Sequence, residues 1–371
     1  MQLRLAWSRI CQMEDVMFRS KLFVFAVALA LLVSAFSGIG RADAAAGRLS
    51  VSINADRASF GAGESALVSV TVRNDGKVPA KVLKWFTPYE DVEDALFVVT
   101  RDGAAVEYLG AHYKRPAPTG ADYVTLAAGE SFTRTVDLGG YYDLSASGRY
   151  SVQFRVSSWF LRSEKGTLVK RDTTLTSNVL ALNIEGRPNP VVRDILPDVV
   201  SGSTSFSRCT ASQQSDLTSA RSNASTYAAN ALAYLSAGTQ GPRYTTWFGI
   251  FDAGRYNTVK SHYASIGSAM DTASVTFNCS CKKKTVYAYV YSNQPYTIYL
   301  CNVFWTAPMT GTDSKAGTLI HEMSHFTVVA GTDDWVYGQA GAQNLASTNP
   351  TNAVDNADNH EYFAENTPYQ P

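Results

Sequence analysis

The chain has 371 residues, and its 32 basic side chains balance 32 acidic ones, so the formal net charge at pH 7 is zero. This balance argues against a nucleic-acid-binding protein and against a protein held on a membrane by basic charge. The length is sufficient for two domains with separate cores, and 12% aromatic residues favour an ordered chain over a disordered one.

Residues 1–46 have the pattern of an export signal. Arg19 and Lys21 precede the apolar run LFVFAVALALLVSAFSGIG, which the small-residue stretch ADAAAG follows. This order is typical of a cleaved secretory signal, whereas the run is short for the alternative, a membrane anchor. Because acidic residues precede the pattern, Met17 is the expected start. No later run is long enough to span a membrane, so a secreted, extracellular protein is expected.

The next part, residues 47–185, is dense in short runs in which Val, Thr, Phe and Tyr alternate with polar residues. Gly, Asn, Asp and Ser interrupt these runs at short intervals. Such alternation is typical of half-buried antiparallel strands, and it predicts an all-β, immunoglobulin-like sandwich. The runs that carry this prediction are RLSVSI, SALVSVTVRN, ALFVVTRDG, SFTRTVDL, RYSVQFRVSS and NVLALNI.

Residues 186–204 contain prolines, glycines and serines without a sustained period, which predicts a linker, and VVSGSTSF within it is the expected processing site. Residues 205–371 have a different texture that predicts a helix-rich α+β domain. Helices are expected over 215–237, over 253–270 and from Lys315 to Val329, ending before Gly331, and two strands are expected within 284–305.

Four cysteines remain once Cys11 is lost with the signal. An even number in an exported chain predicts two disulfides. Cys279 and Cys281 are too close in sequence to bridge each other without strain, so Cys209 would pair with one and Cys301 with the other. A zinc ion bound by these thiols is the alternative, but the CxxC pairs typical of such sites are missing from the sequence.

The segment HEMSH places His321 and His325 four residues apart on a predicted helix. Residues with this spacing share one face of a helix, so both imidazoles can bind one metal ion. Glu322 projects beside them, where a carboxylate can take a proton from a metal-bound water molecule. HExxH is a modest signal by itself, and two packed histidines without a metal are the alternative.

A catalytic zinc ion needs a third protein ligand. A downstream histidine at the metzincin spacing is excluded, because valine occupies position 328 and glycine position 331. A glutamate on a later helix, Glu361 or Glu365, is one possibility. The nearer one is the acidic turn GTDDWVYG, where Gly331 ends the helix and the chain can fold back towards the ion.

HEMSH followed by GTDDWVYG resembles the aspzincin metalloendopeptidases, the family of deuterolysin and peptidyl-Lys endopeptidase, whose pattern is HExxH and then GTxDxxYG. The resemblance extends through CTASQQSDLTSA, TWFGIFD, the four cysteines and NADNHEYFAENTP, so it covers residues 205–371. It implies a zincin-type metalloprotease domain with one zinc ion. The resemblance implies that His321, His325 and Asp334, rather than Asp333, bind the zinc ion. It implies that the Tyr337 hydroxyl stabilises the oxyanion. It also implies the disulfides Cys209–Cys279 and Cys281–Cys301.

Acidic residues dominate the end of the chain, which has seven of them and no lysine or arginine after Lys315. Acid around a cleft favours a cationic substrate side chain, although a solvated acidic surface is the simpler interpretation of any single residue. The stretch NADNHEYFAEN resembles the Lys-specific branch of the family, in which Asp358 and Glu361 would line the pocket for the residue after the scissile bond. That resemblance implies protein or peptide substrates cut before lysine. His360, between the two acids, is expected to be a surface or packing histidine.

A β-domain between a signal and a protease domain is most simply an inhibitory propeptide, and a lysine in it would fit a lysine pocket. Lys165 and Lys170 are the candidates, on an expected loop. A retained binding module is the alternative. For the whole chain, the leading hypothesis is a secreted Xaa–Lys zinc endopeptidase made as a zymogen. The rivals are a deuterolysin-like protease of broader specificity and a non-catalytic secreted module that keeps zinc for structure.

Overall fold

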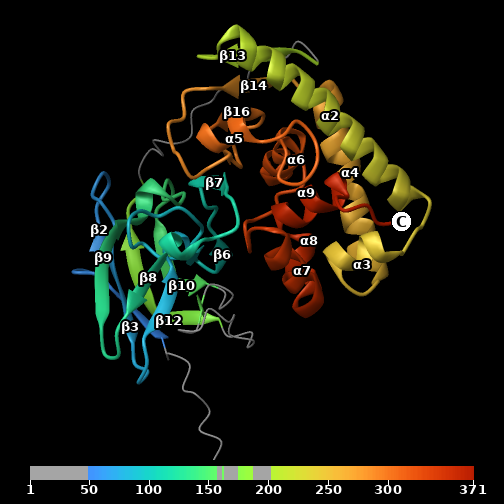
Figure 1. Cartoon of the computed structure of the whole chain (residues 1–371). Coiled ribbons are helices and arrows are strands. Elements are labelled where there is room, and N and C mark those ends of the chain that lie inside the picture. Colours follow the sequence, from blue (N-terminus) through green and yellow to red (C-terminus); the bar gives the residue numbers. More distant parts are fainter. Residues whose placement is uncertain (1–48, 157–160, 163–173, 187–201) are drawn as a thin grey trace, which may run out of the picture. The chain divides into compact units, whose positions relative to one another are not determined.

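The described part of the chain has two regions of different secondary structure: a β-rich region from Leu49 to Ile184 and a helix-rich region from Thr204 onward (Figure 1). The computed structural model describes residues 49–156, 161–162, 174–186 and 202–371. All of these belong to one compact unit of the chain. The expected export signal, most of the expected linker and both candidate lysines, Lys165 and Lys170, lie outside the described residues.

The N-terminal β region is built from three groups of paired strands. One sheet has the order β1–β3–β9, a second has the order β2–β12–β10–β5–β6, and a third has the order β11–β4–β8. The runs predicted as strands form β1, β3, β5, β9, β10 and β12, while the immunoglobulin-like topology stays a prediction. The strands are β1 Leu49–Asn54, β2 Ser59–Phe60, β3 Leu67–Asn74, β4 Ala80–Leu83, β5 Phe97–Arg101, β6 Ala104–Ala105, β7 Ala111–Lys114, β8 Tyr123–Leu126, β9 Ser131–Asp137, β10 Gly148–Val156, β11 Leu161–Arg162 and β12 Leu175–Ile184, with short 3-10 turns η1 Lys84–Phe86, η2 Gly120–Asp122 and η3 Leu138–Gly140.

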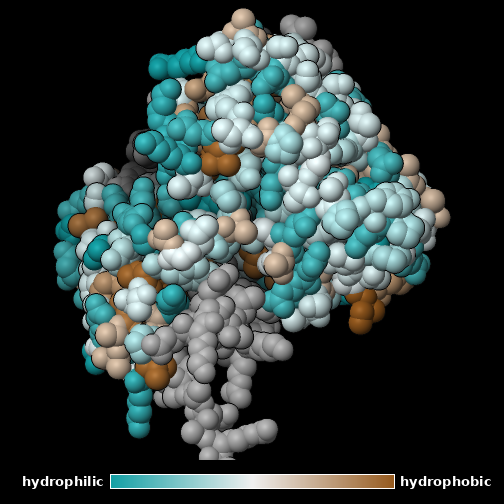
Figure 2. Space-filling model, in the orientation of Figure 1, coloured by the Kyte–Doolittle hydropathy of each residue, from teal (hydrophilic) through white to brown (hydrophobic). Residues whose placement is uncertain are grey.

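Alternation in the sequence decides which face of each strand is buried. In β3 the side chains of Val68, Val70 and Val72 are fully buried, and the residues between them are more exposed. Val152 and Phe154 of β10 belong to the same apolar cluster. Each such side chain contributes about 1.5–3 kcal/mol through removal from water. On the face shown in Figure 2, hydrophobic residues form small separate areas among hydrophilic ones.

The C-terminal region contains eight helices in the part of the chain that the structure describes, and none of these is long and apolar enough to cross a membrane. Its strands are short, and β15 packs against α6. The elements are β13 Thr204–Ser207, α2 Ala211–Ser236, α3 Pro242–Phe248, α4 Ala253–Thr272, β14 Val275–Asn278, β15 Ala288–Tyr291, β16 Thr297–Leu300, α5 Asn302–Thr306, α6 Lys315–His325, α7 Gln339–Thr348, α8 Pro350–Val354 and α9 Ala357–Glu365.

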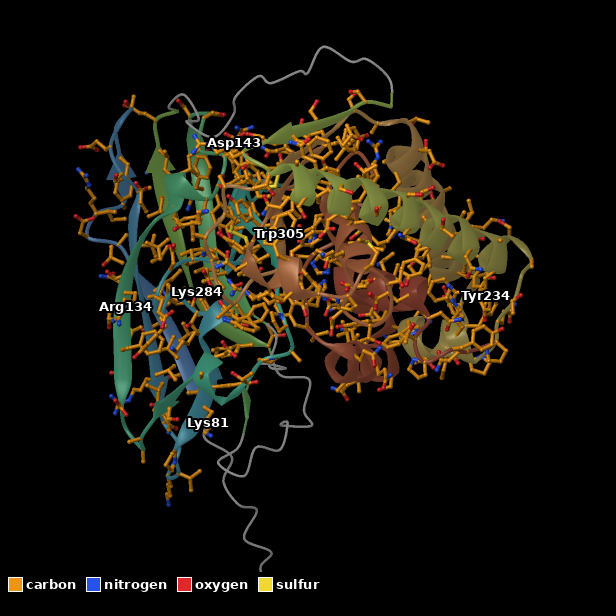
Figure 3. All side chains as sticks on the ribbon, turned by 45° about the horizontal axis from the view of Figure 1, so that its top comes forward. Lys81, Arg134, Asp143, Tyr234, Lys284 and Trp305 are labelled. Atoms are coloured by element: carbon orange, nitrogen blue, oxygen red, sulfur yellow. A yellow bond between two sulfur atoms is a disulfide. The ribbon has the colours of Figure 1, made fainter. Side chains whose placement is uncertain are left out.

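The long helix α2 begins one turn earlier than the sequence predicted. Thr210 caps it, because its hydroxyl accepts a hydrogen bond from the Gln213 backbone N–H while the Gln213 side chain accepts from the Thr210 N–H. The buried face of α2 is rich in alanine, so α4 can approach closely: a Cβ added to Gly267 on α4 would lie 3.7 Å from the Cβ of Ala228. Figure 3 shows α2 extending across the C-terminal region, with Tyr234 near its end.

The helix α6 is shorter than predicted, because it ends at His325 instead of continuing to Val329. Phe326 leaves the helical conformation at ψ 129°, and the Gly331 backbone N–H then donates to the Phe326 carbonyl at 3.1 Å. The Thr332 N–H donates to the Ser324 carbonyl, which closes a tight return of the chain. The helical periodicity of the sequence continues past His325. In the structure the chain reverses there, which brings residues 332–334 beside the last turn of α6.

One strand of the N-terminal half belongs to the C-terminal sheet, and the sequence did not predict it. The sheet has the order β13–β14–β16–β15–β7, and β7 pairs antiparallel with β15. In this pairing Lys114 is opposite Ala288, and His112 is opposite Val290. A segment assigned by sequence to the sandwich therefore completes an edge of the other region's sheet, so residues of β7 lie beside the helices of that region.

The structure contains both disulfides whose pairing the family resemblance implied. Cys209–Cys279 joins the start of α2 to the end of β14 across 70 residues, and Cys281–Cys301 closes a loop of 20 residues. Loops of this size correspond to roughly 3–4.5 kcal/mol of stabilisation each in the chain-entropy model. Together they fix the connection around β14–β16, which is the sheet that receives β7.

Arg221 generates a prediction about stability. Its buried guanidinium donates to the carbonyls of Met270, Ser203 and Ala273 at 2.7–3.1 Å, so it joins α2 to the end of α4 and to the chain before β13. Arg221→Met should lower the free energy of unfolding by about 2–4 kcal/mol, because buried carbonyls lose a charged donor. Urea denaturation followed by helical circular dichroism measures this change.

The matched control is Arg73→Met, since Arg73 is exposed and pairs only with Asp75 among the described contacts. Its effect should stay within about 0.5 kcal/mol. Equal effects of the two substitutions would show that Arg221 does not have the stabilising role assigned to it.

Candidate active site

Helix α6 carries the two histidines of HEMSH and is buried along its whole length. Ser314 caps it, because the Ser314 hydroxyl accepts a hydrogen bond from the Gly317 N–H at 2.9 Å. His321 and His325 follow one turn apart, both fully buried, and their Nε2 atoms are 3.1 Å apart. Two nitrogen atoms at this separation can bind the same ion.

The other ring nitrogen of each histidine faces an oxygen atom. His325 Nδ1 is 2.7 Å from the Thr332 carbonyl, an acceptor that is available because α6 ends early. His321 Nδ1 is 2.9 Å from Asp358 Oδ1, which is an ion-pair distance although the atoms are not aligned as a hydrogen bond. Oxygen partners at Nδ1 leave Nε2 free as the metal-binding atom and orient the ring.

Asp334 brings a carboxylate to the same place. Its Oδ1 is 3.3 Å from His321 Nε2, and its Oδ2 is 3.5 Å from His325 Nε2. Burial alone raises the pKa of Asp334, but His325 and His321 together hold it well below its ordinary value, so the group is ionised. Asp333 turns elsewhere and accepts the Asp334 backbone N–H at 2.9 Å.

Asn356 holds the turn that contains Asp334. Its Oδ1 accepts hydrogen bonds from the backbone N–H groups of Trp335 and Val336 at 2.8 and 3.1 Å. The Asp333 N–H donates to the Asp355 carbonyl at 2.7 Å. These bonds attach the acidic turn to the start of α9, so the placement of Asp334 is fixed from outside the site. The sequence motif did not reveal this role of Asn356.

The residues present fit a zinc ion. Both carboxylate oxygens of Asp334 and both of Glu322 are buried and have no hydrogen-bond partner among the described residues. Buried polar atoms without partners are costly, so such atoms indicate a missing ligand or water molecule. Two imidazoles and one carboxylate are the donor set of a catalytic zinc site with an open position. His321, His325 and Asp334 are the residues that would hold the ion.

Glu322 is fully buried beside these ligands, and burial raises its pKa well above the ordinary value. The backbone N–H of Lys114 on β7 lies close enough to have the opposite, smaller effect on that pKa. Tyr337 is buried as well, and its described ring contacts are with Trp85 at 5.4 Å and Phe86 at 6.2 Å between ring centres. Its predicted role at the oxyanion stays a prediction.

Asp358 and Glu361 lie on one face of α9 and share a cation. The ammonium nitrogen of Lys114 is 2.8 Å from Asp358 Oδ1 and 2.8 Å from Glu361 Oε2. It is also 3.3 Å from Asp313 Oδ1. Burial lowers the pKa of Lys114, but Asp358 and Glu361 raise it well above its ordinary value, so the ammonium stays charged.

The groups around the Lys114 ammonium are called the lysine pocket below. Sequence reasoning missed several of its residues. Asp313 supplies a third carboxylate, and the Tyr362 hydroxyl donates to it at 2.7 Å. The rings of Tyr287 and Tyr362 lie 5.6 and 5.2 Å from the ammonium. Asp313 has a left-handed backbone (φ 52°), and an aspartate before a helix cap was the one local signal of a special position.

Glu365 and His360 do not enter the pocket. Glu365 accepts hydrogen bonds from the backbone N–H and the hydroxyl of Ser314, both at 2.8 Å, at the opposite end of α6 from His325. Gly317 permits this approach, because a Cβ there would collide with the Glu365 carboxylate. His360 packs against His262 with ring nitrogens 3.0 Å apart. His360 is fully buried, so of the two expected positions, surface or packing, it has the packing one.

Comparisons with known proteins show which family the chain is similar to. A family model described as lysine-specific metallo-endopeptidase matches residues 233–365. An extracellular protease of Aeromonas hydrophila is 47% identical over 315 residues, 83% of this chain and 90% of that protein. A peptidyl-Lys metalloendopeptidase of Pleurotus ostreatus is 57% identical over 164 residues, 44% of this chain and 97% of that protein. The solved structure of a zinc peptidase from Grifola frondosa is 51% identical and covers 44% of this chain and 100% of that chain, with a TM-score of 0.43.

The buried His360 predicts acid sensitivity. Burial lowers its pKa from 6.5 to about 3, so the folded protein binds this proton less readily than the unfolded chain does. Stability from this group is present above pH 6.5 and is lost as the pH falls towards 3. The loss should be about 1.4 kcal/mol per pH unit within this window.

Urea denaturation at pH 7, 6, 5 and 4 measures that slope in the full chain and in His360→Gln. The substitution should make the slope shallower by one proton, whatever its effect on absolute stability. An unchanged slope would show that His360 titrates normally.

Proposed function

Since this chain belongs to the family of lysine-specific metallo-endopeptidases, we propose that it is secreted and hydrolyses peptide bonds on the amino side of lysine. The protein is a zinc metalloendopeptidase. We further propose that it is made as a zymogen, with residues 47–185 as an inhibitory propeptide, 186–204 as the linker that is cut and 205–371 as the catalytic domain.

The proposed chemistry divides among residues already described. His321, His325 and Asp334 would hold the zinc ion, and a bound ion would supply acidification of a water molecule and polarisation of the substrate carbonyl. Glu322, buried with a raised pKa, takes the proton of that water and passes it to the departing amine. Tyr337 donates its hydroxyl to the oxyanion of the tetrahedral intermediate. The buried carboxylate oxygens of Glu322 and Asp334 have no hydrogen-bond partner among the described residues, and this supports the roles of these two residues.

The observation that carries the lysine specificity is the ammonium of Lys114 between Asp358 and Glu361. A neutral side chain would leave buried carboxylates without a counter-charge, and such unpaired groups are strongly unfavourable. Asp313 adds further negative charge at the end of the pocket. The pocket therefore discriminates by electrostatics, and the family description points to the same residue type.

The segment around Lys114 is also proposed to occupy the position of a bound substrate peptide. An extended peptide that adds a strand to a sheet edge is a common mode of peptide binding, and β7 pairs with β15 in this way. The backbone N–H of Lys114 lies close enough to Glu322 to lower its pKa against the larger effect of burial, and this proximity supports a substrate-like position for the Tyr113–Lys114 bond. Tyr113 packs its ring on Tyr289 of β15 at 5.3 Å.

This placement supports inhibition by the N-terminal β region, because a segment held in the cleft excludes other peptides from it. The inhibitory lysine is then Lys114, whereas the sequence had suggested Lys165 or Lys170, which lie outside the described residues. A further ion pair supports the docked strand: Glu93 accepts from Arg115 at 2.6 Å and from Lys283 at 2.7 Å.

The first test is a digest of a denatured protein by the processed enzyme, with and without a zinc chelator, in which mass spectrometry identifies every new N-terminus. We expect chelator-sensitive cuts that expose lysine, and Glu322→Gln should abolish them while zinc content and helical circular dichroism are unchanged. Cuts without lysine preference would favour the deuterolysin-like alternative. An absence of cuts by folded, zinc-loaded enzyme would favour the non-catalytic module.

Glu361→Gln tests the pocket itself. Loss of one partner of a buried charge pair costs about 2–5 kcal/mol, so kcat/KM for a peptide with lysine after the scissile bond should fall by roughly 30-fold to several thousand-fold. Asp271→Asn is the matched control. Asp271 is exposed near the end of α4, where it accepts a hydrogen bond from the Ser225 hydroxyl of α2. An equal loss in the two variants would exclude a specific role for Glu361.

Lys114→Ala tests the inhibition. The full chain should cleave a short lysine-containing peptide at least about 10-fold faster than the unsubstituted full chain, because loss of the buried ion pair weakens docking of β7. Initial rates are measured before any processing, which gel electrophoresis monitors. Lys84→Ala, which removes a partly exposed pair with Glu90, is the control and should change nothing. Unchanged rates in Lys114→Ala would contradict inhibition through this lysine.

A further inference from the structure

His112 lies on the same strand face as Lys114, two residues before it. Side chains at i and i+2 of a strand point to the same side, so a strand that directs Lys114 into the pocket also directs His112 towards α6. The exposed fraction of the His112 side chain is 10%, so this imidazole from the N-terminal region is almost buried. The proposed catalytic roles make no use of it.

The His112 ring lies at the proposed zinc site. It stacks on His325 with ring centres 4.7 Å apart and an angle of 28° between the planes. Ligand atoms of His112, His325 and Asp334 all lie within 4.8 Å of one another, which is the spacing of a group that can hold one metal ion. His325 and Asp334 are already assigned as zinc ligands, and His325 Nε2 is 3.1 Å from His321 Nε2, so His112 lies beside the assigned ligand set.

The surroundings of His112 resemble those of the other two histidines. His112 Nδ1 is 3.5 Å from Asp333 Oδ1, as His321 Nδ1 is near Asp358 and His325 Nδ1 is near Thr332. In each case an oxygen atom faces Nδ1, which leaves the second ring nitrogen available and orients the imidazole. This also gives a role to Asp333, which the ligand set left unused.

We propose that His112 is a fourth protein ligand of the zinc ion in the full chain, before the N-terminal region is removed. This inference rests on the proposed function of the zinc site. Four protein ligands make the closed shell of a structural zinc site, whereas catalysis needs an open position for water. The neutral imidazole of His112 takes that position, and no proton or electron is transferred to the ion.

The consequence is a second restraint on the latent enzyme, on the same strand as the lysine restraint. Lys114 excludes substrate, while His112 excludes the water molecule that Glu322 would activate. Both residues lie on β7, so departure of that one strand removes both restraints at once. The alternative is a protonated His112 that pairs with Asp333 beside the site without binding the ion.

X-ray absorption at the zinc edge distinguishes these arrangements in the full chain. Glu322→Gln is used as the background so that the chain stays intact during loading with zinc. The proposal expects three imidazole ligands in this protein and two after His112→Ala is added. Tyr113→Ala is the matched control, since Tyr113 lies on the opposite face of β7, and it should retain three imidazoles.

Zinc retention supplies a second readout. Loss of a group that supports a metal site typically lowers metal affinity 10–100-fold, so transfer of zinc to a chelator should be at least about 10-fold faster in His112→Ala than in Tyr113→Ala. Two imidazoles in the unsubstituted background would overturn the proposal even if the variants failed to fold. Three imidazoles that persist in a folded His112→Ala chain would overturn it as well.

These outcomes are separate from those of the digest. A digest without lysine preference would leave an imidazole count of three intact, and a count of two would leave the lysine specificity intact.

Discussion

The buried ion pair of Lys114 with Asp358 and Glu361 is the interaction on which the arrangement of the whole protein depends. The two carboxylates lie within reach of one ammonium, and without a cation the burial of both would be strongly unfavourable. A cation must therefore be supplied, either by β7 or by a substrate. Under the proposed function the same electrostatic demand explains the choice of lysine and the tight docking of the N-terminal region, so specificity and restraint have one physical origin.

Asp358 links this pocket to the proposed metal centre. Its Oδ1 lies 2.8 Å from the Lys114 ammonium and 2.9 Å from His321 Nδ1. Burial raises the pKa of Asp358, but Lys114 and His321 together lower it by more, so the net shift is downward. Under the proposed function, a lysine in the pocket would stabilise the ionised carboxylate that orients a zinc-binding histidine. Asp358 would then serve both substrate binding and the orientation of a zinc ligand.

The sequence predicted the parts of this site that are encoded locally. HEMSH placed two histidines on one helical face, and the acidic turn after Gly331 placed Asp334 within reach because the chain reverses there. Helical periodicity overran the end of α6, since it does not register the turn bonds that stop the helix at His325. Lys114 and His112 could not be found in this way. Their positions follow from pairing of β7 with a strand more than 170 residues later, and local pattern contains no information about such a partner.

The position of β7 has a consequence for biosynthesis. Chains emerge from the ribosome from the N-terminus, and domains fold as units in that order. The strand that carries His112 and Lys114 is therefore made well before α6 and α9, which follow some 200 residues later. When the nascent catalytic region first assembles, the segment that fills its cleft is already present on the same molecule. Under the proposed function, an uninhibited protease never exists inside the cell that makes it.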